Sequence, residues 1–201
     1  MLTNISLTII FWIFYFFIHS FLANRFVKNR LINSLHLSNK VYRLLYSLIS
    51  VLGLLLLLYF LSVTKSDFLL PQTQMLKFTS LALSTWGVII IKMAFKNYRL
   101  REFLGFKDMP DQLNLAQSGI LKYVRHPIYT GTILLFIGFW LFIPNVLNLV
   151  TVICTFLYLP IGIRLEEQKL EEEYGDLYRR YKDKVPALIP DLEYLFKSNQ
   201  R

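Results

Sequence analysis

The sequence predicts an all-α integral membrane protein with about five transmembrane helices and a cytosolic C-terminal helix. Hydrophobic residues make up 55% of the 201 residues and charged residues only 17%, whereas roughly 25% is typical of soluble domains. The apolar residues lie in long uncharged runs, and the cations lie in the segments between those runs. We therefore expect residues 1–201 to form a single membrane domain.

The expected spans follow from the uncharged runs. A helix needs about 20 apolar residues to cross a hydrocarbon core, and three runs in the first half of the chain approach that length. The uncharged region from Pro127 to Ile163 is too long for one crossing, and Pro144-Asn145 near its middle predicts a tight hairpin between two helices. The last two helices are each short for a full crossing. The expected spans are residues 5–22, 44–63, 78–95, 128–143 and 146–163.

The distribution of lysine and arginine predicts the orientation. The segments 24–43 and 92–127 and the tail after residue 163 are rich in both residues, whereas the N-terminus before Ile5 and the Pro144 hairpin contain neither. Because positively charged residues stay on the cytoplasmic side, we expect the N-terminus outside and the C-terminus in the cytoplasm, in a bacterial inner membrane. We interpret the first run as a retained span rather than a cleaved signal. Since the cations follow membrane topology, nucleic acid is not an expected partner.

The tail is expected to form one cytosolic helix, about residues 164–184, that continues from the fifth span. Its first half is acidic and its second half is basic, which suits the helix dipole. Pro186 ends the helix. Apolar and aromatic residues at three- and four-residue spacing give it one continuous face: Leu170, Tyr174, Leu177, Tyr178 and Tyr181.

The stretch from Lys122 to Gly131 is chemically the most varied part of the chain, and it borders the fourth span. His126 precedes a proline and is therefore pushed out of helical geometry, and Pro127 suits the first turn of the next helix. Backbone N–H groups at such a helix N-terminus can bind an anion. The alternative interpretation is a positively charged membrane anchor with an interfacial tyrosine and histidine.

Two carboxylates, Glu166 and Glu167, follow the fifth span directly. Because the membrane interface penalises carboxylates, we interpret the pair as a counter-charge for a bound cation or as a brace for Arg125 or Arg164. The alternative is that they begin a solvated helix face. The hairpin returns the chain to the same membrane face, so we expect His126 and Glu166 to lie side by side.

His19 lies near the cytoplasmic end of the first span. One interpretation is a hydrogen-bonded packing residue. Another pairs His19 with His126 as axial ligands of a haem, although a histidine before a proline is poorly placed to hold a rigid ligand. No metal site is predicted, since no cluster of cysteine and histidine has zinc spacing, and phosphate-binding glycine motifs are absent from the sequence.

From Val124 onward the chain contains an ordered set of residues: Val124-Arg125-His126-Pro127-Ile128-Tyr129-Thr130-Gly131, Glu166-Glu167, Tyr174-Gly175, Tyr178, Tyr181, Val185-Pro186 and Pro190. This set resembles the superfamily of isoprenylcysteine carboxyl methyltransferases and phospholipid methyltransferases. Nearer the N-terminus, His19-Ser20 and Tyr42-Arg43 look like the branch that holds methanethiol S-methyltransferases and NnrU-like membrane proteins.

This resemblance implies a methyltransferase that uses S-adenosyl-L-methionine at the cytosolic membrane face. The acceptor would be a small apolar thiol, or a lipid-like, isoprenylcysteine-type thiol or carboxylate that enters from the bilayer. The implied alternative is an NnrU-like haem-binding or accessory membrane protein without this activity. The implied cofactor-binding residues are Lys122, Tyr123, Val124, Arg125, His126, Pro127, Tyr129, Glu167, Tyr178, Tyr181 and Pro186, with Pro190 closing the pocket.

The residue types suit that chemistry. A sulfonium cation is favoured by aromatic faces and carboxylates, and the carboxylate of the cofactor suits Arg125 or Lys122. A neutral thiol acceptor needs deprotonation, for which His126 or His19 is the natural base. The expected catalytic residues are therefore His126, Arg125, Glu166, Glu167 and His19.

Overall fold

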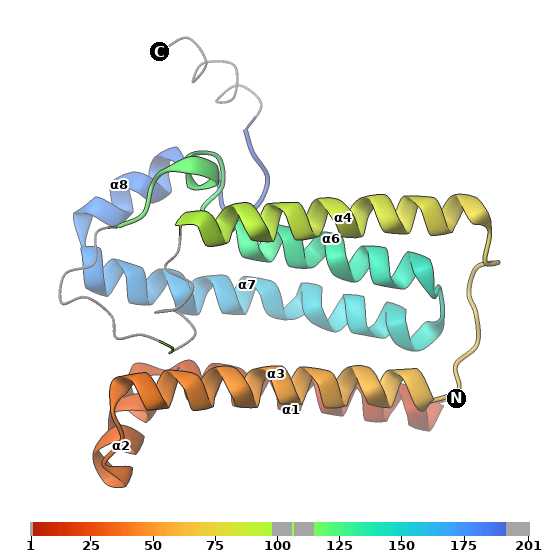
Figure 1. Cartoon of the computed structure of the whole chain (residues 1–201), viewed down its shortest axis with the longest axis horizontal. Helices are drawn as coiled ribbons and strands as arrows, with labels where there is room; N and C mark the ends of the chain where they lie inside the picture. The colour runs from red at the N-terminus through yellow and green to blue at the C-terminus, as the bar shows by residue number, and fades with distance from the viewer. Residues whose placement is uncertain (1, 98–105, 107–114, 192–201) are drawn as a thin grey trace. The chain divides into compact units, whose positions relative to one another are not determined.

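The computed structural model describes residues 2–97, 106 and 115–191. Within these ranges four helices are long and apolar enough to cross a membrane and one further apolar helix is shorter, which confirms the predicted all-α membrane fold. Much of the basic connection predicted between the third and fourth spans lies outside the described residues. The helices are α1 Leu2–Ala23, α2 Arg25–Leu35, α3 Asn39–Val63, α4 Gln74–Asn97, the 3₁₀ helix η1 Gly119–Lys122, α6 Pro127–Phe142, α7 Val146–Tyr174 and α8 Asp176–Lys184 (Figure 1).

The described residues fall into two compact units, and the first contains α1, α2, α3 and α7 as far as Tyr158. The indole nitrogen of Trp12 on α1 donates a hydrogen bond to the Thr151 hydroxyl on α7 at 3.0 Å. The rings of Phe16 and Tyr158 stack with their centroids 4.0 Å apart. Because lipid offers no hydrogen-bond partners, such contacts between helices satisfy polar groups that would otherwise be costly in a membrane.

The basic segment after α1, which we interpreted as a loop between spans, forms the helix α2. The Asn24 side chain caps its N-terminus by accepting hydrogen bonds from the backbone N–H groups of Phe26 and Val27, at 2.8 and 3.4 Å. His36 ends the helix in a left-handed conformation with φ 51°. Asparagine is among the best N-cap residues and left-handed C-caps are common, so local capping explains a helix that charge patterning alone does not predict.

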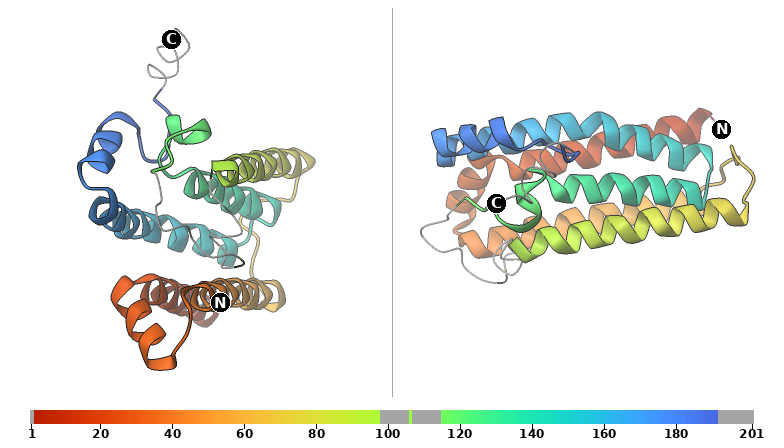
Figure 2. Two further views of the ribbon diagram at one scale, coloured as in Figure 1. Left: turned by 60° about the vertical axis from the view of Figure 1, so that its left-hand side comes forward. Right: turned by 90° about the horizontal axis from the view of Figure 1, so that it is seen from above.

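The second unit contains α4, η1, α6, α7 from Leu159 onward, and α8. Figures 1 and 2 show α4 and α6 running side by side. Their backbones approach closely at Gly87 and Gly131, where a Cβ added to either residue would lie 2.7 Å from the carbonyl oxygen of the other. The Ser80 hydroxyl also donates to the Gly138 carbonyl at 2.7 Å. Small residues at such contacts are typical of helix packing in membranes.

The predicted hairpin at Pro144-Asn145 is confirmed. Helix α6 ends at Phe142 and α7 begins at Val146. The Asn145 side chain accepts a hydrogen bond from the backbone N–H of Asn148 at 2.8 Å, which caps the first turn of α7. The hairpin therefore has both the breaking residue and the cap that a sharp change of direction requires.

The tail predicted over residues 164–184 is helical on both sides of Gly175, but the prediction of one continuous helix is wrong. Helix α7 continues through Pro160 and ends at Tyr174. Gly175 then adopts φ 55° and ψ −130°, a conformation that residues with a side chain rarely adopt. Helix α8 starts directly afterwards, and Figure 1 shows it turning away from the axis of α7. The tail is therefore two helices joined at a glycine.

Candidate active site

The stretch between η1 and α6 is held by the chain segment that follows α8. The backbone N–H of Arg125 donates to the Pro186 carbonyl, and that of His126 donates to the Ala187 carbonyl, both at 2.9 Å. We expected backbone N–H groups of this stretch to be able to bind an anion, but these two already donate hydrogen bonds within the protein. The pairing brings the end of the described chain against the motif that the sequence singled out.

The Arg125 side chain lies between a carboxylate on α7 and carbonyl groups at the end of α8. Its Nε and Nη2 donate to Glu167 Oε1 at 3.1 and 2.7 Å. Its Nη1 donates to the backbone carbonyls of Lys182, at 2.8 Å, and Val185. The arginine and glutamate side chains are only 10% and 8% exposed, so this ion pair is largely removed from water. Arg125 therefore ties together η1–α6, α7 and α8.

His126 lies between the two glutamates. Its Nε2 is 3.1 Å from Glu167 Oε1, and its Nδ1 is 3.4 Å from Glu166 Oε2. The His126 side chain is 2% exposed, whereas that of Glu166 is 42% exposed. The ring of Tyr129, one turn along α6, lies 5.5 Å from the imidazole, centroid to centroid. The side-by-side placement of His126 and Glu166 expected from the hairpin is present.

Lys182 completes this cluster, and sequence reasoning did not find it. Its Nζ lies 2.8 Å from Glu167 Oε2 and 3.0 Å from Glu171 Oε1. In one continuous helix, Lys182 and Glu167 would be separated by roughly 22 Å along the axis. The turn at Gly175 brings them together. We call Arg125, His126, Glu166, Glu167 and Lys182 the ionic clasp.

The ionic clasp keeps Glu167 ionised. Glu167 lies beyond Ile163, where the uncharged part of α7 ends. Burial by itself would raise the pKa of this carboxyl group, but hydrogen bonds from Lys182, Arg125 and His126 lower it from an ordinary value of 4.5 to about 2. The same contacts raise the pKa of the Lys182 ammonium group, chiefly through its hydrogen bond to Glu167. The carboxylate is therefore a fixed negative charge at neutral pH.

The lowered pKa of Glu167 predicts how stability depends on pH. Because the folded pKa of about 2 lies below the ordinary 4.5, the stabilisation is complete above about pH 5 and is lost as the pH falls from 4.5 towards 2. We expect the loss to be on the order of 3 kcal/mol. Melting curves of the detergent-solubilised protein at successive pH values measure it. In a Glu167→Gln variant, stability should fall less between pH 4.5 and 2, because the titrating carboxyl group is gone. A loss of stability as large as in the wild type would show that Glu167 is not its source.

Two tyrosines of α8 pack beside the ionic clasp in a buried cluster with Val185. The Tyr181 hydroxyl donates to the Leu121 carbonyl at 2.7 Å, which fixes α8 to η1. Tyr178 is 1% exposed, and within the described residues its hydroxyl oxygen has no hydrogen-bond partner. Burial raises the pKa of the Tyr178 phenol, and the charge of Glu167 raises it further. A buried hydroxyl without a partner is costly, so Tyr178 is a candidate for contact with a ligand.

The remaining residues predicted to line the pocket differ in their exposure. Val124 and Pro127 are buried, Tyr123 and Pro186 are half-buried, and Lys122 is exposed. Thr130, which was not assigned a role from sequence although it lies in the same motif, donates from its hydroxyl to the Leu188 carbonyl at 2.7 Å.

His19 belongs to the first unit, whereas the ionic clasp belongs to the second. Its Nδ1 lies 3.1 Å from the Ser50 hydroxyl, and its Nε2 lies 3.0 Å from the Tyr46 hydroxyl. Both ring nitrogens of His126 likewise face carboxylates. Each ring nitrogen of both histidines therefore has a protein partner, and the haem alternative stays a prediction.

Comparison with protein families gives one match over most of the chain. The family model described as "Protein of unknown function (DUF1295)" matches residues 11–185. This range includes the whole ionic clasp together with α1, from Phe11 onward, and α3. No solved structure matches the chain.

Several similar proteins are named as methyltransferases. A methanethiol S-methyltransferase of Crocosphaera subtropica is 32% identical over 120 residues, which cover 56% of this chain and 46% of that protein. Methanethiol S-methyltransferase 1 of Bradyrhizobium diazoefficiens is 42% identical over 72 residues, 35% of this chain and 24% of that protein. A protein-S-isoprenylcysteine O-methyltransferase of Schizosaccharomyces pombe is 35% identical over 77 residues, 38% and 33% of the two chains. The matched part of this chain spans less than half the length of each relative.

Proposed function

The chain belongs to the DUF1295 family, and from its ionic clasp and its methyltransferase relatives we propose that it is an integral-membrane methyltransferase that uses S-adenosyl-L-methionine. The observation that carries the proposal is the clasp itself. It combines a buried Arg125–Glu167 ion pair, a histidine between two carboxylates and the buried Tyr178 hydroxyl that lacks a partner. The methyltransferase names of the relatives supply the reaction type.

The residues present fit this cofactor. A sulfonium and an ammonium group need negative or aromatic neighbours, and Glu166 offers a carboxylate that is 42% exposed. Tyr129 offers a half-buried ring beside His126. The Tyr178 hydroxyl is buried and has no hydrogen-bond partner within the described residues, so it can bond to the cofactor. Lys122 is exposed and can attract the carboxylate of the cofactor.

The two glutamates take different roles in this proposal. Glu167 Oε1 accepts hydrogen bonds from Arg125 and His126, and its Oε2 pairs with Lys182. A carboxylate so fully occupied is a positioning residue. Glu166 makes one long contact with His126 and remains accessible, so we assign to Glu166 the contact with the positive charge of the cofactor.

When bound, S-adenosyl-L-methionine supplies an electrophilic methyl group for in-line displacement by the acceptor. The protein's part is mainly positioning, which can account for much of the acceleration in such reactions. The Arg125–Glu167 pair ties α7 to the start of α6, and the turn at Gly175 brings α8 with Tyr178 beside the clasp. His126 Nδ1, which faces the accessible Glu166, is the atom that can hold a proton released by a neutral thiol.

The proposed acceptor is a small apolar thiol or a lipid-like thiol or carboxylate of the isoprenylcysteine type, methylated at the cytosolic membrane face. The relatives act on methanethiol and on protein-S-isoprenylcysteine, as their names state. The helices long and apolar enough to cross a membrane support a bilayer location, which suits an apolar or lipid-like acceptor. The positive segments support a cytosolic position for the residues that follow α7.

Calorimetric titration of S-adenosylhomocysteine into the folded, detergent-solubilised protein tests the proposed cofactor. Saturable binding that releases heat is expected, and an absence of binding to folded protein would overturn the proposal. Transfer of a labelled methyl group to methanethiol, longer alkyl thiols, isoprenylated cysteine and phosphatidylethanolamine then identifies the acceptor. Labelling of none of these acceptors, with cofactor binding intact, would contradict the proposed acceptor classes.

Tyr178→Phe is expected to weaken S-adenosylhomocysteine binding about five- to tenfold, the value of one hydrogen bond. It should leave the melting temperature unchanged or raise it, since the hydroxyl has no partner within the described residues. Tyr181→Phe is the matched control, because it removes the bond to the Leu121 carbonyl and should cost about 1 kcal/mol of stability. Equal losses of stability in the two variants, or undiminished binding by Tyr178→Phe, would show that Tyr178 has no role in binding.

A further inference from the structure

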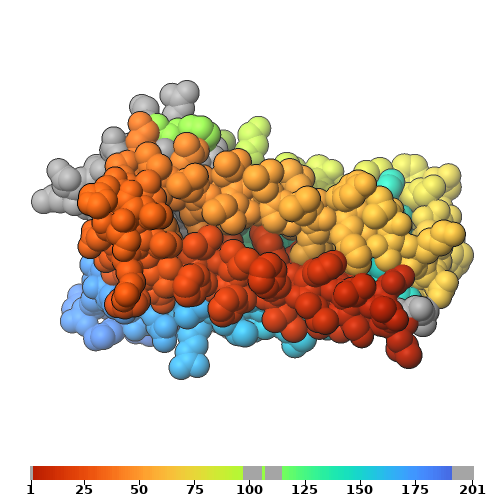
Figure 3. Space-filling model, turned by 90° about the horizontal axis from the view of Figure 1, so that it is seen from below, coloured from red at the N-terminus to blue at the C-terminus, as the bar shows by residue number. Residues whose placement is uncertain are grey.

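A cavity of about 330 Å³ lies between α1 and α3 in the first unit. These two helices lie side by side on the face shown in Figure 3, and both are long and apolar enough to span a membrane. The volume is within the range of pockets that hold small molecules. Phe14 and Leu56 line the cavity and are 62% and 68% exposed, so the opening has apolar edges that suit hydrocarbon rather than water.

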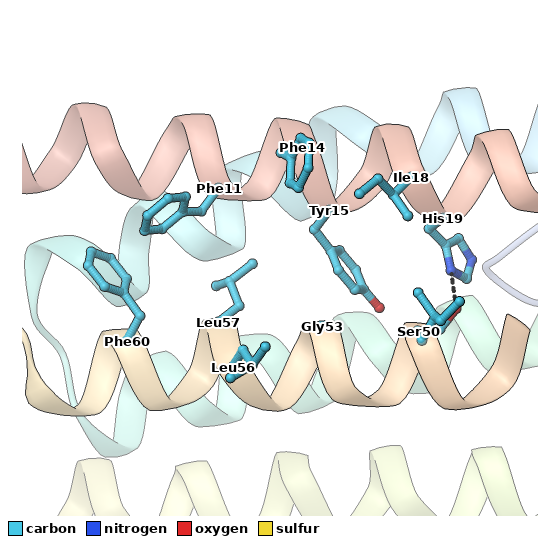
Figure 4. A pocket seen from close by; sticks show the side chains of 11 residues that line it. Phe11, Phe14, Tyr15, Ile18, His19, Ser50, Gly53, Leu56, Leu57 and Phe60 are labelled. Carbon is cyan, nitrogen blue, oxygen red and sulfur yellow. Dashed lines mark hydrogen bonds between the residues drawn. The ribbon is translucent and has the colours of Figure 1, made fainter. Parts of the chain in front are cut away.

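The two ends of the cavity differ chemically, as Figure 4 shows. At one end the rings of Phe11 and Phe60 meet edge to face with their centroids 4.9 Å apart. At the other end His19 Nδ1 lies 3.1 Å from the Ser50 hydroxyl, and the ring of Tyr15 stacks against the imidazole with a centroid distance of 6.0 Å. The cavity therefore has an apolar end and a polar end.

Tyr15 is the polar group best placed to meet a ligand. In the part of the chain that the structure describes, its hydroxyl takes part in none of the hydrogen bonds, whereas His19 already contacts Ser50 and Tyr46. The Tyr15 ring lies against Gly53 of α3, where an added Cβ would be 3.2 Å from Tyr15 Cδ2. The absence of a side chain at Gly53 thus makes the room that lets the phenol reach the cavity (Figure 4).

Hydrogen bonds between α1 and α3 account for His19, Ser50 and Tyr46, but they do not account for the Tyr15 hydroxyl. Ionisable residues within transmembrane helices are costly and usually mark functional sites. A cavity with one polar end and otherwise apolar walls fits a ligand with a hydrocarbon tail and one small polar head group. The ligand must also come from the bilayer, because the edges of the opening are apolar.

We propose that the α1–α3 cavity binds a single-tailed amphiphile taken from the bilayer. Its hydrocarbon tail lies between Phe11 and Phe60 on one side and Tyr15 on the other. Its small hydroxyl or thiol head group hydrogen-bonds to the Tyr15 hydroxyl beside His19 and Ser50. This binding site is independent of the ionic clasp and does not require the proposed methyl transfer.

The test uses a photoreactive decanol, with a diazirine in its tail, on the full-length protein in phosphatidylcholine nanodiscs. We expect saturable labelling of peptides from α1 and α3. Unlabelled decanol and decanethiol should compete about fivefold better than decane at equal membrane concentration, because decane lacks the head-group hydrogen bond. Unsaturable labelling, spread evenly over the lipid-facing helices, would overturn the proposal, and so would equal competition by decane.

Two variants, each with a control, locate the site. Leu56→Trp fills the cavity and should abolish saturable labelling, whereas Leu55→Trp, at an exposed neighbouring position that does not line the cavity, should not. Tyr15→Phe should remove the preference for decanol over decane without lowering the melting temperature. Tyr42→Phe, which loses a hydrogen bond to the Leu22 carbonyl, should lower stability and keep the preference. Labelling of Leu56→Trp at the wild-type level would show that the ligand binds elsewhere.

Discussion

Glu167→Gln is expected to lower the free energy of unfolding by about 3–5 kcal/mol, the usual cost of breaking a buried ion pair. The substitution keeps the size of the side chain but removes the negative charge that Arg125 and Lys182 share. Arg125 would then remain 10% exposed without its only charged partner among the described residues. Thermal unfolding of the detergent-solubilised protein measures the loss, and calorimetry with S-adenosylhomocysteine measures its effect on the site.

Glu166→Gln is the matched control for this prediction. It carries the same chemical change one position away, on a side chain that is 42% exposed and makes one contact of 3.4 Å. A surface pair of this kind contributes about 0–1 kcal/mol, so the melting temperature should hardly change. If the proposed roles are right, Glu166→Gln weakens cofactor binding while the fold remains intact. Equal stability losses in the two variants would contradict the separation into a positioning and a contacting carboxylate.

The spans and the hairpin were predictable because they depend on local composition. A run without charges either crosses a membrane or is buried, and Pro144-Asn145 in the middle of such a run leaves few alternatives to a turn. The hairpin then predicted that His126 and Glu166 would meet, and the structure places them 3.4 Å apart. Topology therefore predicted one contact of the ionic clasp, between His126 and Glu166, from local sequence patterns alone.

The position of Lys182 in the clasp depends on one backbone conformation that sequence patterns do not reveal. Tyr174, Tyr178 and Tyr181 keep helical spacing across Gly175, so the periodicity predicted one continuous helix. A glycine inside a helix lowers helix stability by only about 1 kcal/mol relative to alanine, so its presence alone does not predict a break in the helix. Lys182 was missed for the same reason, since its partner Glu167 is near only after the chain has turned.

Gly175→Ala is therefore expected to disturb the ionic clasp, although Gly175 has no side chain that could contact it. An added Cβ would meet no atom within 4 Å, but φ is 55°, and holding a residue with a side chain in such a conformation costs about 1–3 kcal/mol. Alanine also favours continuation of α7 into a straight helix. Straightening would separate Lys182 from Glu167 and Tyr178 from its place beside the clasp. We expect a lower melting temperature and a large loss of S-adenosylhomocysteine affinity.

A double-variant comparison distinguishes this mechanism from simple backbone strain. If Gly175→Ala acts by moving α8, then adding Lys182→Ala should cost little more, because the lysine contacts are already lost. If the two losses of stability add in full, the alanine strains the turn but leaves α8 in place, and the proposed straightening is wrong.

Asp176→Ala serves as the control for a substitution at the neighbouring position. It removes only an exposed ion pair with Arg179, whose side chain is 64% exposed, and should leave both the melting temperature and the affinity unchanged.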